Sequence, residues 1–361
     1  MVSTQILQNT IDGIKSISNV DLGILDTEGK VIVTTFPESY ECETSAVAFV
    51  DSKESVLDAG GYQFHKIFDE QQLEYILLVN GTSEETKVVG KMASFQIQSL
   101  MVAYKERFDK DNFIKNLLLD NLLRVDIYTR AKKLHIETDV RRIVYIVETK
   151  HEKDNNALET LRTLFASKSK AFVTAVDEKN IIIVKEVKNE SYDELDKTAK
   201  IIVDMLNSEA MSSVNVAYGT IVNDIREVSR SYKEAKLALE VGKIFYSDKN
   251  VVAYNKLGIG RLIYQLPLPM CQIFIKEIFD GKSPDDLNEE MLSTITSFFE
   301  NDLNVSATSR EMYFHRYTLV YRLDRLQEMT GLDLRKFDDA ITFKITLMVV
   351  KYMKYINSRE N

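Results

Sequence analysis

Residues 304–326 read NVSATSREMYFHRYTLVYRLDRL, and this stretch decides the fold of the C-terminal part of the chain. Ser306 is a natural N-cap, because its hydroxyl can accept a hydrogen bond from the free amides of a first helical turn. The helix that it begins runs to about residue 313, and Phe314-His315 separate it from a second helix. Leucines recur on one face of the second helix at spacings of 4 and 3: Leu319, Leu323 and Leu326. The pattern predicts two short helices joined by a tight turn.

Further helical patterns flank this pair. Residues 287–300 predict a helix before it, and residues 337–356 predict a final amphipathic helix. Gly331 supplies the C-terminal stop of the second helix of the pair. We therefore expect an all-α C-terminal domain over residues 286–361.

The second helix of the pair carries polar side chains outside its leucine face. A short helix pair with a polar second helix meets the geometric need of a reader of the DNA major groove. Residues 304–336 hold six basic and four acidic residues, a net charge of +2 in a chain of net charge −9. Charge alone also leaves open a solvated helical pair within a regulatory bundle.

Residues 137–255 predict a second, α/β domain. Strand patterns at 143–148, 171–176, 181–187 and 214–218 alternate with helical patterns at 157–165 and 192–206 in the order β-α-β-β-α-β. A helix at 224–241 and a strand at 251–254 complete it, and we expect the helices on one face of the sheet. Residues 256–285, with three of the four prolines and the lone Gly258-Ile259-Gly260 turn, are expected to form a linker with its own helix.

The first hundred residues predict a small antiparallel sheet with one buried face. Strand patterns at 20–25 and 31–35 form a hairpin, and two more follow at 62–68 and 73–79. A long amphipathic helix then runs over 84–108, with apolar residues at steps of 3 or 4: Val89, Ala93, Ile97, Leu100, Tyr104 and Phe108. This layout resembles a PAS-like or GAF-like sensor over residues 1–108. The charged break at 109–111 begins a helical connector, residues 109–136, with a short helix at 131–135.

A sensor pocket combines apolar walls with a few polar groups, which makes Thr35, Tyr40 and His65 the candidate ligand contacts. His65 also fits the role of a structural histidine on a strand, because Phe64 and Phe68 flank it. The resulting architecture is a multidomain α+β chain.

Composition bounds the function of the chain. The 361 residues begin without a signal peptide and contain no apolar run long enough to span a membrane, so we expect a cytoplasmic protein. Cys42 and Cys271 lie far apart, and the four histidines have no ligand spacing, so we expect neither a metal nor a cofactor. No nucleophile elbow occurs, and the sequence offers no catalytic residue.

Three motifs carry a family resemblance: N-V-S-A-T from residue 304, F-H-R-x-T-L-x-Y-R-L-x-R-L from residue 314, and T-G-L-D-L from residue 330. They resemble the C-terminal helix-turn-helix of the PucR and CdaR family of bacterial transcription regulators. Residues 217–219 and 231–239 are similar to the degenerate GGDEF-like domain of that family, so the resemblance covers roughly residues 112–361. The chain departs from the family at Tyr317, where Asn is common, and in lacking the R-I-G-x-x-H stretch of sugar-diacid recognition modules.

The resemblance implies a set of DNA contacts. Arg316, Thr318 and Tyr321 would approach base edges. Phosphate contacts, which position a protein on DNA, would come from Ser306, Thr308, Arg322 and Arg325. His315 would serve in either class.

The resemblance also implies a function, a ligand-responsive regulator of metabolic genes that is not an enzyme. Its partners would be a double-stranded DNA operator, a small metabolite effector and at least one further copy of the chain, with no membrane. We expect residues 84–122 to form the seam of the dimer or higher homo-oligomer. The stripe of Val89, Ala93, Ile97, Leu100 and Tyr104 lies either at that seam or against the sheet of its own domain. The alternative is a nucleotide-binding or nucleotide-processing signalling protein built on residues 137–255. The turn at Asp177-Glu178-Lys179-Asn180 disfavours it, because no glycine there lets backbone approach a nucleotide.

Overall fold

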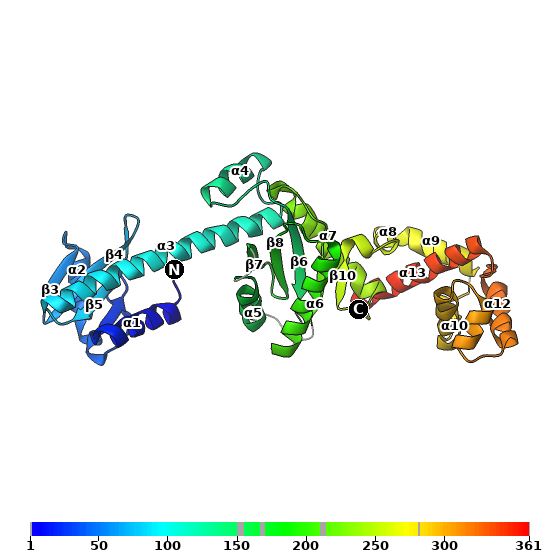
Figure 1. Cartoon of the computed structure of the whole chain (residues 1–361), viewed down its shortest axis with the longest axis horizontal. Coiled ribbons are helices and arrows are strands. Elements are labelled where there is room, and N and C mark those ends of the chain that lie inside the picture. The colour runs from blue at the N-terminus through cyan, green and yellow to red at the C-terminus, as the bar shows by residue number, and fades with distance from the viewer. Residues whose placement is uncertain (1, 150–154, 167–169, 210–213, 281, 361) are drawn as a thin grey trace. The chain divides into compact units, whose positions relative to one another are not determined.

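The computed structural model describes residues 2–149, 155–166, 170–209, 214–280 and 282–360 (Figure 1). The chain forms two compact units. The first comprises residues 1–114 with 133–136, and the second comprises residues 115–132 with 137–361. None of the helices in the described ranges is long and apolar enough to cross a membrane.

The first unit is built on a five-stranded antiparallel sheet of strand order β2-β1-β5-β4-β3. Its strands are β1 (Leu22–Leu25), β2 (Val31–Thr34), β3 (Val56–Ala59), β4 (Tyr62–Asp69) and β5 (Gln72–Asn80). The hairpin of β1 and β2 is confirmed by the antiparallel pairing of Ile24 with Val33. The sequence pattern missed β3, an edge strand that exposes alternate residues and carries little apolar signal.

Both faces of this sheet are buried, so the expectation of a single buried face is wrong. Helices α1 (Thr4–Ser18) and α3 (Glu84–Leu118) cover one face, where Ile24 and Leu77 pack. Helix α2 (Glu43–Val50) and the 3₁₀ helix Pro37–Cys42 cover the other, where Phe64 and Leu78 pack. The physical reason is the uninterrupted apolar run at residues 76–79 of β5, which presents apolar side chains to both faces.

Helix α3 is continuous from Glu84 to Leu118, so the expected break at residues 109–111 is wrong. Asp costs a helix interior only about 0.7 kcal/mol relative to Ala, so Asp109 and Asp111 do not end a long helix. Of the two expected positions of the apolar stripe, the structure has the second: the stripe packs on the protein's own sheet, where Ala93 and Ile97 are fully buried.

The second unit begins with α4 (Arg124–Lys133), which starts earlier than the expected helix at 131–135, and continues into a five-stranded sheet of order β10-β9-β6-β8-β7. The strands are β6 (Arg142–Glu148), β7 (Ala171–Ala175), β8 (Asn180–Glu186), β9 (Asn215–Tyr218) and β10 (Val251–Ala253). Helices α5 (Asn155–Ala166) and α6 (Tyr192–Glu209) complete the predicted β-α-β-β-α-β order, which is confirmed.

The two helices of this order share one face of the sheet, as predicted, but α7 covers the other face, which corrects the expectation of helices on one face alone. Helices α5 and α6 pack on Tyr145 and Val147 of β6. Helix α7 (Val228–Phe245) packs on β6 and β9, where Ser231 accepts a hydrogen bond from the amide of Val144, 3.1 Å away. Gly219 permits this approach, because a Cβ there would lie 2.1 Å from the Ser231 carbonyl oxygen. Strand β6 is apolar on both faces, and it therefore needs cover on both.

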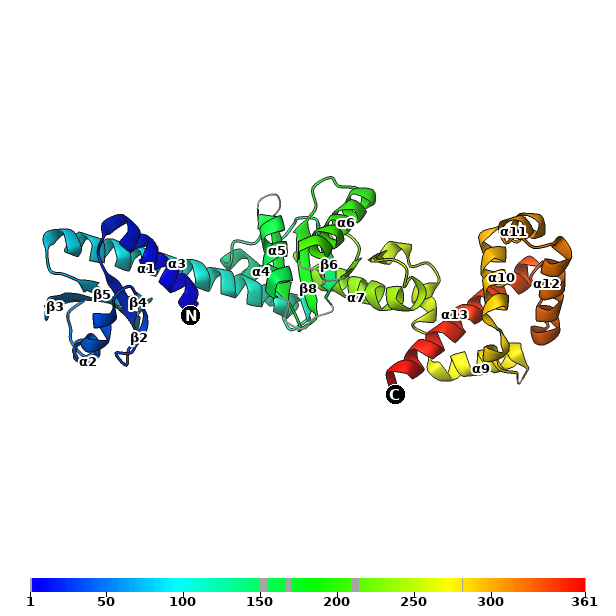
Figure 2. The same ribbon diagram turned by 90° about the horizontal axis from the view of Figure 1, so that it is seen from below.

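Six helices close the chain: α8 (Gly260–Ile263), α9 (Leu268–Phe279), α10 (Glu289–Glu300), α11 (Val305–Glu311), α12 (Arg316–Thr330) and α13 (Phe337–Glu360). Figure 2 shows α9 beside the long α13, and the two helices are in contact. Phe279 of α9 is buried with Phe298 and Phe343 in one core. The segment predicted as a linker thus contributes a helix to the packing of the C-terminal domain.

Candidate nucleic-acid interface

Helix α11 is capped by Asn304, not by Ser306 as the sequence suggested. The Asn304 side chain accepts hydrogen bonds from the amides of Ser306 and Ala307, each at 3.0 Å. Its backbone is extended and Val305 is already helical, so Ser306 lies inside the first turn with an exposed side chain. Asn and Ser cap helices about equally well, and the backbone position therefore selects between them.

Helix α12 begins at Arg316, with His315 as its N-cap. The His315 Nδ1 accepts a hydrogen bond from the amide of Tyr317 at 3.4 Å, and the two rings stack with centroids 5.4 Å apart. The helix ends at Gly331, whose φ of +74° is the left-handed C-cap predicted from the sequence. The three leucines of the predicted inner face, Leu319, Leu323 and Leu326, are buried as expected.

The outer face of α12 exposes most of the predicted DNA contacts: Arg316, Thr318, Tyr321 and Arg325. It also exposes Tyr317, which is 80% accessible, beside Tyr313 of the preceding turn at 95%. Sequence reasoning did not assign either of these two tyrosines to the interface. For Tyr317 the signal was available, because Tyr317 and Tyr321 are four residues apart on α12, which brings side chains to one side of a helix. Tyr313 lies in the turn before the helix, where helical spacing does not place a side chain.

Charge is distributed unevenly along α12. The exposed Arg316 lies at its N-terminal end, whereas Asp324 and Glu328 lie in its later turns. Asp324 forms an ion pair with Arg335 at 2.9 Å, and Arg335 also contacts Asp333 at 2.6 Å. The Arg335 guanidinium lowers the pKa of Asp333, so the Asp333 carboxylate is ionised at neutral pH and pairs with Arg335. Exposed positive charge therefore lies on Arg316 at the N-terminal end, where the helix dipole adds to the attraction for an anion, and on Arg325 in the later turns.

Two predicted phosphate contacts are corrected by the structure. Thr308 is fully buried, and its hydroxyl donates to the Asn304 carbonyl oxygen at 2.9 Å, so it cannot reach a phosphate. The Arg322 side chain is only 14% exposed. It donates to the Thr294 hydroxyl at 2.7 Å, pairs with Glu290, and lies 4.3 Å from the centre of the Phe314 ring. Arg322 therefore attaches α12 to α10.

Two of the residues predicted to bind a ligand already have partners inside the first unit. The Thr35 hydroxyl donates to Asp21 at 2.8 Å and accepts from the Leu22 amide at 3.0 Å. The His65 ring is buried, with its Nε2 3.3 Å from Gln63, and burial lowers its pKa. Helix α3 packs directly on this ring, because a Cβ at Gly90 would lie 2.5 Å from Nε2. These contacts fit the role of a structural histidine for His65. In the part of the chain described, Thr35 and His65 share no hydrogen-bond partner.

The third candidate ligand contact, Tyr40, has a side chain that lies outside the described residues.

In the second unit the Asp177 carboxylate closes the tight turn between β7 and β8, accepting hydrogen bonds from the amides of Lys179 and Asn180 at 2.9 and 2.8 Å. Within the described ranges, no group of three or more His, Cys, Asp or Glu side chains is arranged to hold a metal ion.

Two family models match the chain. The PucR C-terminal helix-turn-helix domain matches residues 291–349, which includes α11 and α12. The GGDEF-like domain matches residues 120–241.

Similar proteins give the same result. A carbohydrate diacid regulator of Escherichia coli (strain K12) is 21% identical over 376 residues, covering 96% of this chain and 98% of that protein. The DNA-binding transcriptional activator AdeR of Bacillus subtilis (strain 168) is 29% identical over 38% of this chain and 33% of its own length. The purine catabolism regulatory protein of the same organism is 21% identical over 39% and 27%. The chain matches both the helix-turn-helix and the GGDEF-like models, and it is similar to the carbohydrate diacid regulator along nearly the whole length of both proteins. The chain therefore belongs to the PucR/CdaR family of transcription regulators.

Proposed function

We propose that this regulator binds double-stranded operator DNA through the N-terminal half of α12 and alters its DNA affinity when a small metabolite binds. One observation carries the DNA part: the leucine face anchors α12, while arginine, threonine and tyrosine side chains at its N-terminal end face water. A recognition helix contacts base edges with such N-terminal residues. The controlled genes are metabolic, in keeping with the names of the similar regulators.

The individual contacts follow from position on α12. Base edges are assigned to Arg316, Thr318 and Tyr321, with Tyr317 added because its exposed ring can pack on a thymine methyl group. Phosphate contacts are assigned to Ser306 and Arg325, which are exposed. Thr308 and Arg322 are no longer assigned to phosphates, because neither side chain is exposed. His315, at the cap of α12, serves in either class.

A binding experiment with two DNA probes tests this assignment. The probes are an operator fragment selected from genomic DNA by the wild-type protein and a mixed-sequence duplex of equal length. Arg316→Ala and Tyr321→Ala should weaken operator binding by about 5- to 150-fold, the effect of 1 to 3 kcal/mol, with little effect on the mixed duplex. Arg162→Ala, which changes a partly exposed arginine of α5, is the matched control. Unchanged operator affinity in both variants would remove α12 as the reader.

The sensor is assigned to residues 1–108 as a PAS-like or GAF-like domain. Its support is the small antiparallel sheet with helices on both faces, which is the layout of a small-molecule sensor. The remaining proposed divisions are a connector over 109–136, a degenerate GGDEF-like domain over 137–255, a linker over 256–285 and the DNA-binding domain over 286–361. Deleting residues 1–82 should abolish the response of DNA binding to metabolites while DNA binding itself remains. A truncated protein that still responds would move the sensor to residues 137–255.

We assign the dimer seam to the exposed face of α3, with a second copy of the chain as the occupant. Val88, Met92, Phe95 and Val102 are all more than half exposed and follow each other at steps of 4, 3 and 7, the spacing of a coiled-coil seam. Two copies would place two DNA readers on half-sites about 34 Å apart or a multiple of that distance. Phe95→Asp should convert a dimer to a monomer in light scattering, whereas Val125→Asp on α4 should not. A monomeric wild-type protein would refute the seam.

We propose no catalytic role for the GGDEF-like domain. The Asp177 carboxylate, which lies where a cyclase would need glycines and free metal ligands, is engaged by the amides of its own turn. The nucleotide-processing alternative therefore has no observation in its favour. The proposed regulator acts in the cytoplasm, where its operator DNA and metabolite are found.

A further inference from the structure

Helix α7 makes polar contacts at its N-terminal end with the segment that follows α3. Asp120, two residues after the end of α3, accepts a hydrogen bond from Ser229 and forms an ion pair with Lys233. These two partners lower the pKa of Asp120, so its carboxylate is ionised at neutral pH. Just before α7, Asp224 accepts a hydrogen bond from the Tyr128 hydroxyl of α4 at 2.5 Å. The connector is thereby attached to the start of α7.

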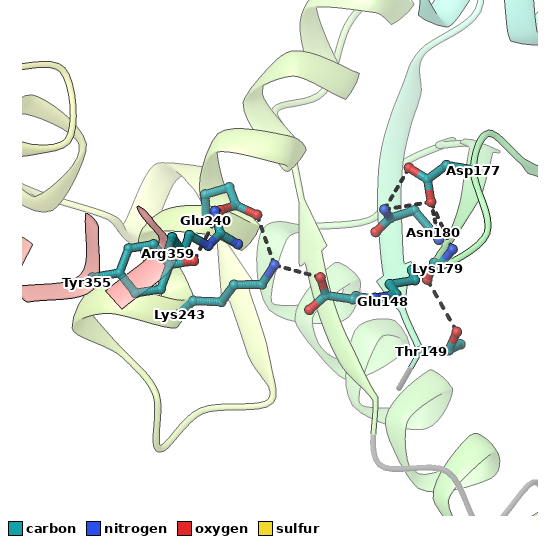
Figure 3. Close-up of polar contacts among 9 residues, drawn as sticks. All are labelled: Glu148, Thr149, Asp177, Lys179, Asn180, Glu240, Lys243, Tyr355 and Arg359. Atoms are coloured by element: carbon teal, nitrogen blue, oxygen red, sulfur yellow. Dashed lines mark hydrogen bonds and ion pairs between the residues drawn. The ribbon is translucent and has the colours of Figure 1, made fainter. Parts of the chain in front are cut away.

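The C-terminal end of α7 contacts α13 through Glu240 (Figure 3). The Glu240 carboxylate accepts hydrogen bonds from Lys243 at 2.9 Å, from Arg359 at 3.0 Å and from the Tyr355 hydroxyl at 3.3 Å. Lys243 also donates to Glu148, the last residue of β6, at 2.6 Å. One chain of charges therefore runs from the sheet of the GGDEF-like domain through α7 to the last turns of α13.

An apolar contact lies beside these charges. Ile244 of α7 packs with Cys271 of α9 and with Val349, Tyr352 and Met353 of α13. The other half of α13 belongs to the DNA-binding core, because Phe343 is buried with Leu323 of the recognition helix. Helix α13 is thus one continuous helix that contacts α7 at one end and packs with the recognition helix at the other.

We propose that α7 couples the connector after α3 to α13, so that a change in the Asp120 contact alters how α13 is attached and where the recognition helix lies. Ser229 and Glu240 are eleven residues apart, about 16 Å along a stiff helix. The side chains of Glu148, Lys243 and Glu240 are about four-fifths buried, so solvent screens their attraction weakly. Arg359 is about half exposed, and it can leave Glu240 for water while Lys243 stays paired with Glu148. In the proposed coupling, the two arrangements that communication between sites requires are Arg359 paired with Glu240 and Arg359 in water.

This inference rests on the proposed function and deepens it. Its test measures the coupling in the protein without DNA. The coupling can therefore be refuted while the proposed DNA binding is retained. Hydrogen exchange of the full chain, followed by mass spectrometry, reports the opening of α13 at residues 349–359. Glu240→Gln and Arg359→Gln should each raise the exchange rates there by about tenfold, as loss of a charge-assisted bond does. Arg359→Gln alters an exposed side chain and keeps the test valid if Glu240→Gln destabilises the fold.

Asp120→Asn is the decisive variant, because Asp120 does not contact α13 in the structure described. If α7 couples the two sites, Asp120→Asn should raise the hydrogen-exchange rates at residues 349–359 by about threefold. A threefold change corresponds to a coupling free energy below 1 kcal/mol. Glu159→Gln, which breaks the exposed pair with Arg162 on α5, should leave these residues unchanged. If Asp120→Asn affects only the first turns of α7, or if both Glu240→Gln and Arg359→Gln leave α13 unchanged, the coupling does not exist.

Discussion

Replacing Arg322 by alanine should destabilise the DNA-binding domain without removing a phosphate contact. The change deletes a charge-assisted hydrogen bond to Thr294, a side chain that is itself fully buried, worth about 1.5 to 3 kcal/mol. It also removes the stacking of the guanidinium on Phe314, worth about 0.5 to 1 kcal/mol. The pair with Glu290 adds at most about 1 kcal/mol, because Glu290 is 66% exposed. Since such contributions overlap, we expect a loss of about 2 to 4 kcal/mol in the free energy of unfolding.

Arg325→Ala is the matched control, three residues further along the same helix and exposed to water. It should change the free energy of unfolding by less than about 0.5 kcal/mol. Its loss of a phosphate contact should reduce the slope of log K against log salt by about 0.9 on a mixed-sequence duplex. Arg322→Ala, measured at a temperature where the domain is folded, should keep the wild-type slope.

Urea unfolding followed by circular dichroism, and fluorescence anisotropy of labelled DNA over a salt series, measure the two quantities. The reasoning is refuted if Arg322→Ala leaves stability unchanged and lowers the salt slope. That result would mean that the guanidinium leaves Thr294 and contacts DNA in the complex.

Three further predictions follow from the same contacts. Asn304→Ala should lower the free energy of unfolding, measured in urea, by about 1 kcal/mol, because Asn304 caps α11. Ser306→Ala should lower it much less, and equal losses in the two variants would contradict the cap. Leu323→Ala should cost about 2 to 5 kcal/mol by the same method through the cavity it leaves, and a loss below 1 kcal/mol would argue against a packed core. Arg226 and Tyr128 lower the pKa of Asp224 to about 2, so its contribution to stability is present above about pH 4 and is lost as the pH falls through 2. The stability difference between the wild type and Asp224→Asn should therefore vanish in acid, and a difference that persists at pH 2 would assign it to packing.

The C-terminal helix pair was predictable from the sequence because local signals specify it. The spacing of Leu319, Leu323 and Leu326 fixes the buried face of α12, and Gly331 fixes its end. The choice between Asn304 and Ser306 as a cap was not predictable, because both residue types cap helices and one residue of backbone register decides between them. The spacing of the apolar stripe on α3 left open whether it packs on its own sheet or on a second copy, because both kinds of contact bury the same residues; the structure places it on the sheet of the same unit.

The sequence by itself determined the β-α-β-β-α-β order of the second unit, the buried face of the recognition helix and, through its motifs, the family of the protein. These features depend on neighbours a few residues away, whose spacing is printed in the sequence. Only the tertiary structure decided that Arg322 binds Thr294 of α10, that Thr308 is buried, and that Glu240 contacts Arg359 of α13. The residue type of an arginine and its spacing along the helix are the same whether its side chain faces DNA or a neighbouring helix. Its role is decided by which distant side chains the fold brings within hydrogen-bonding distance, because partly buried charges require a partner.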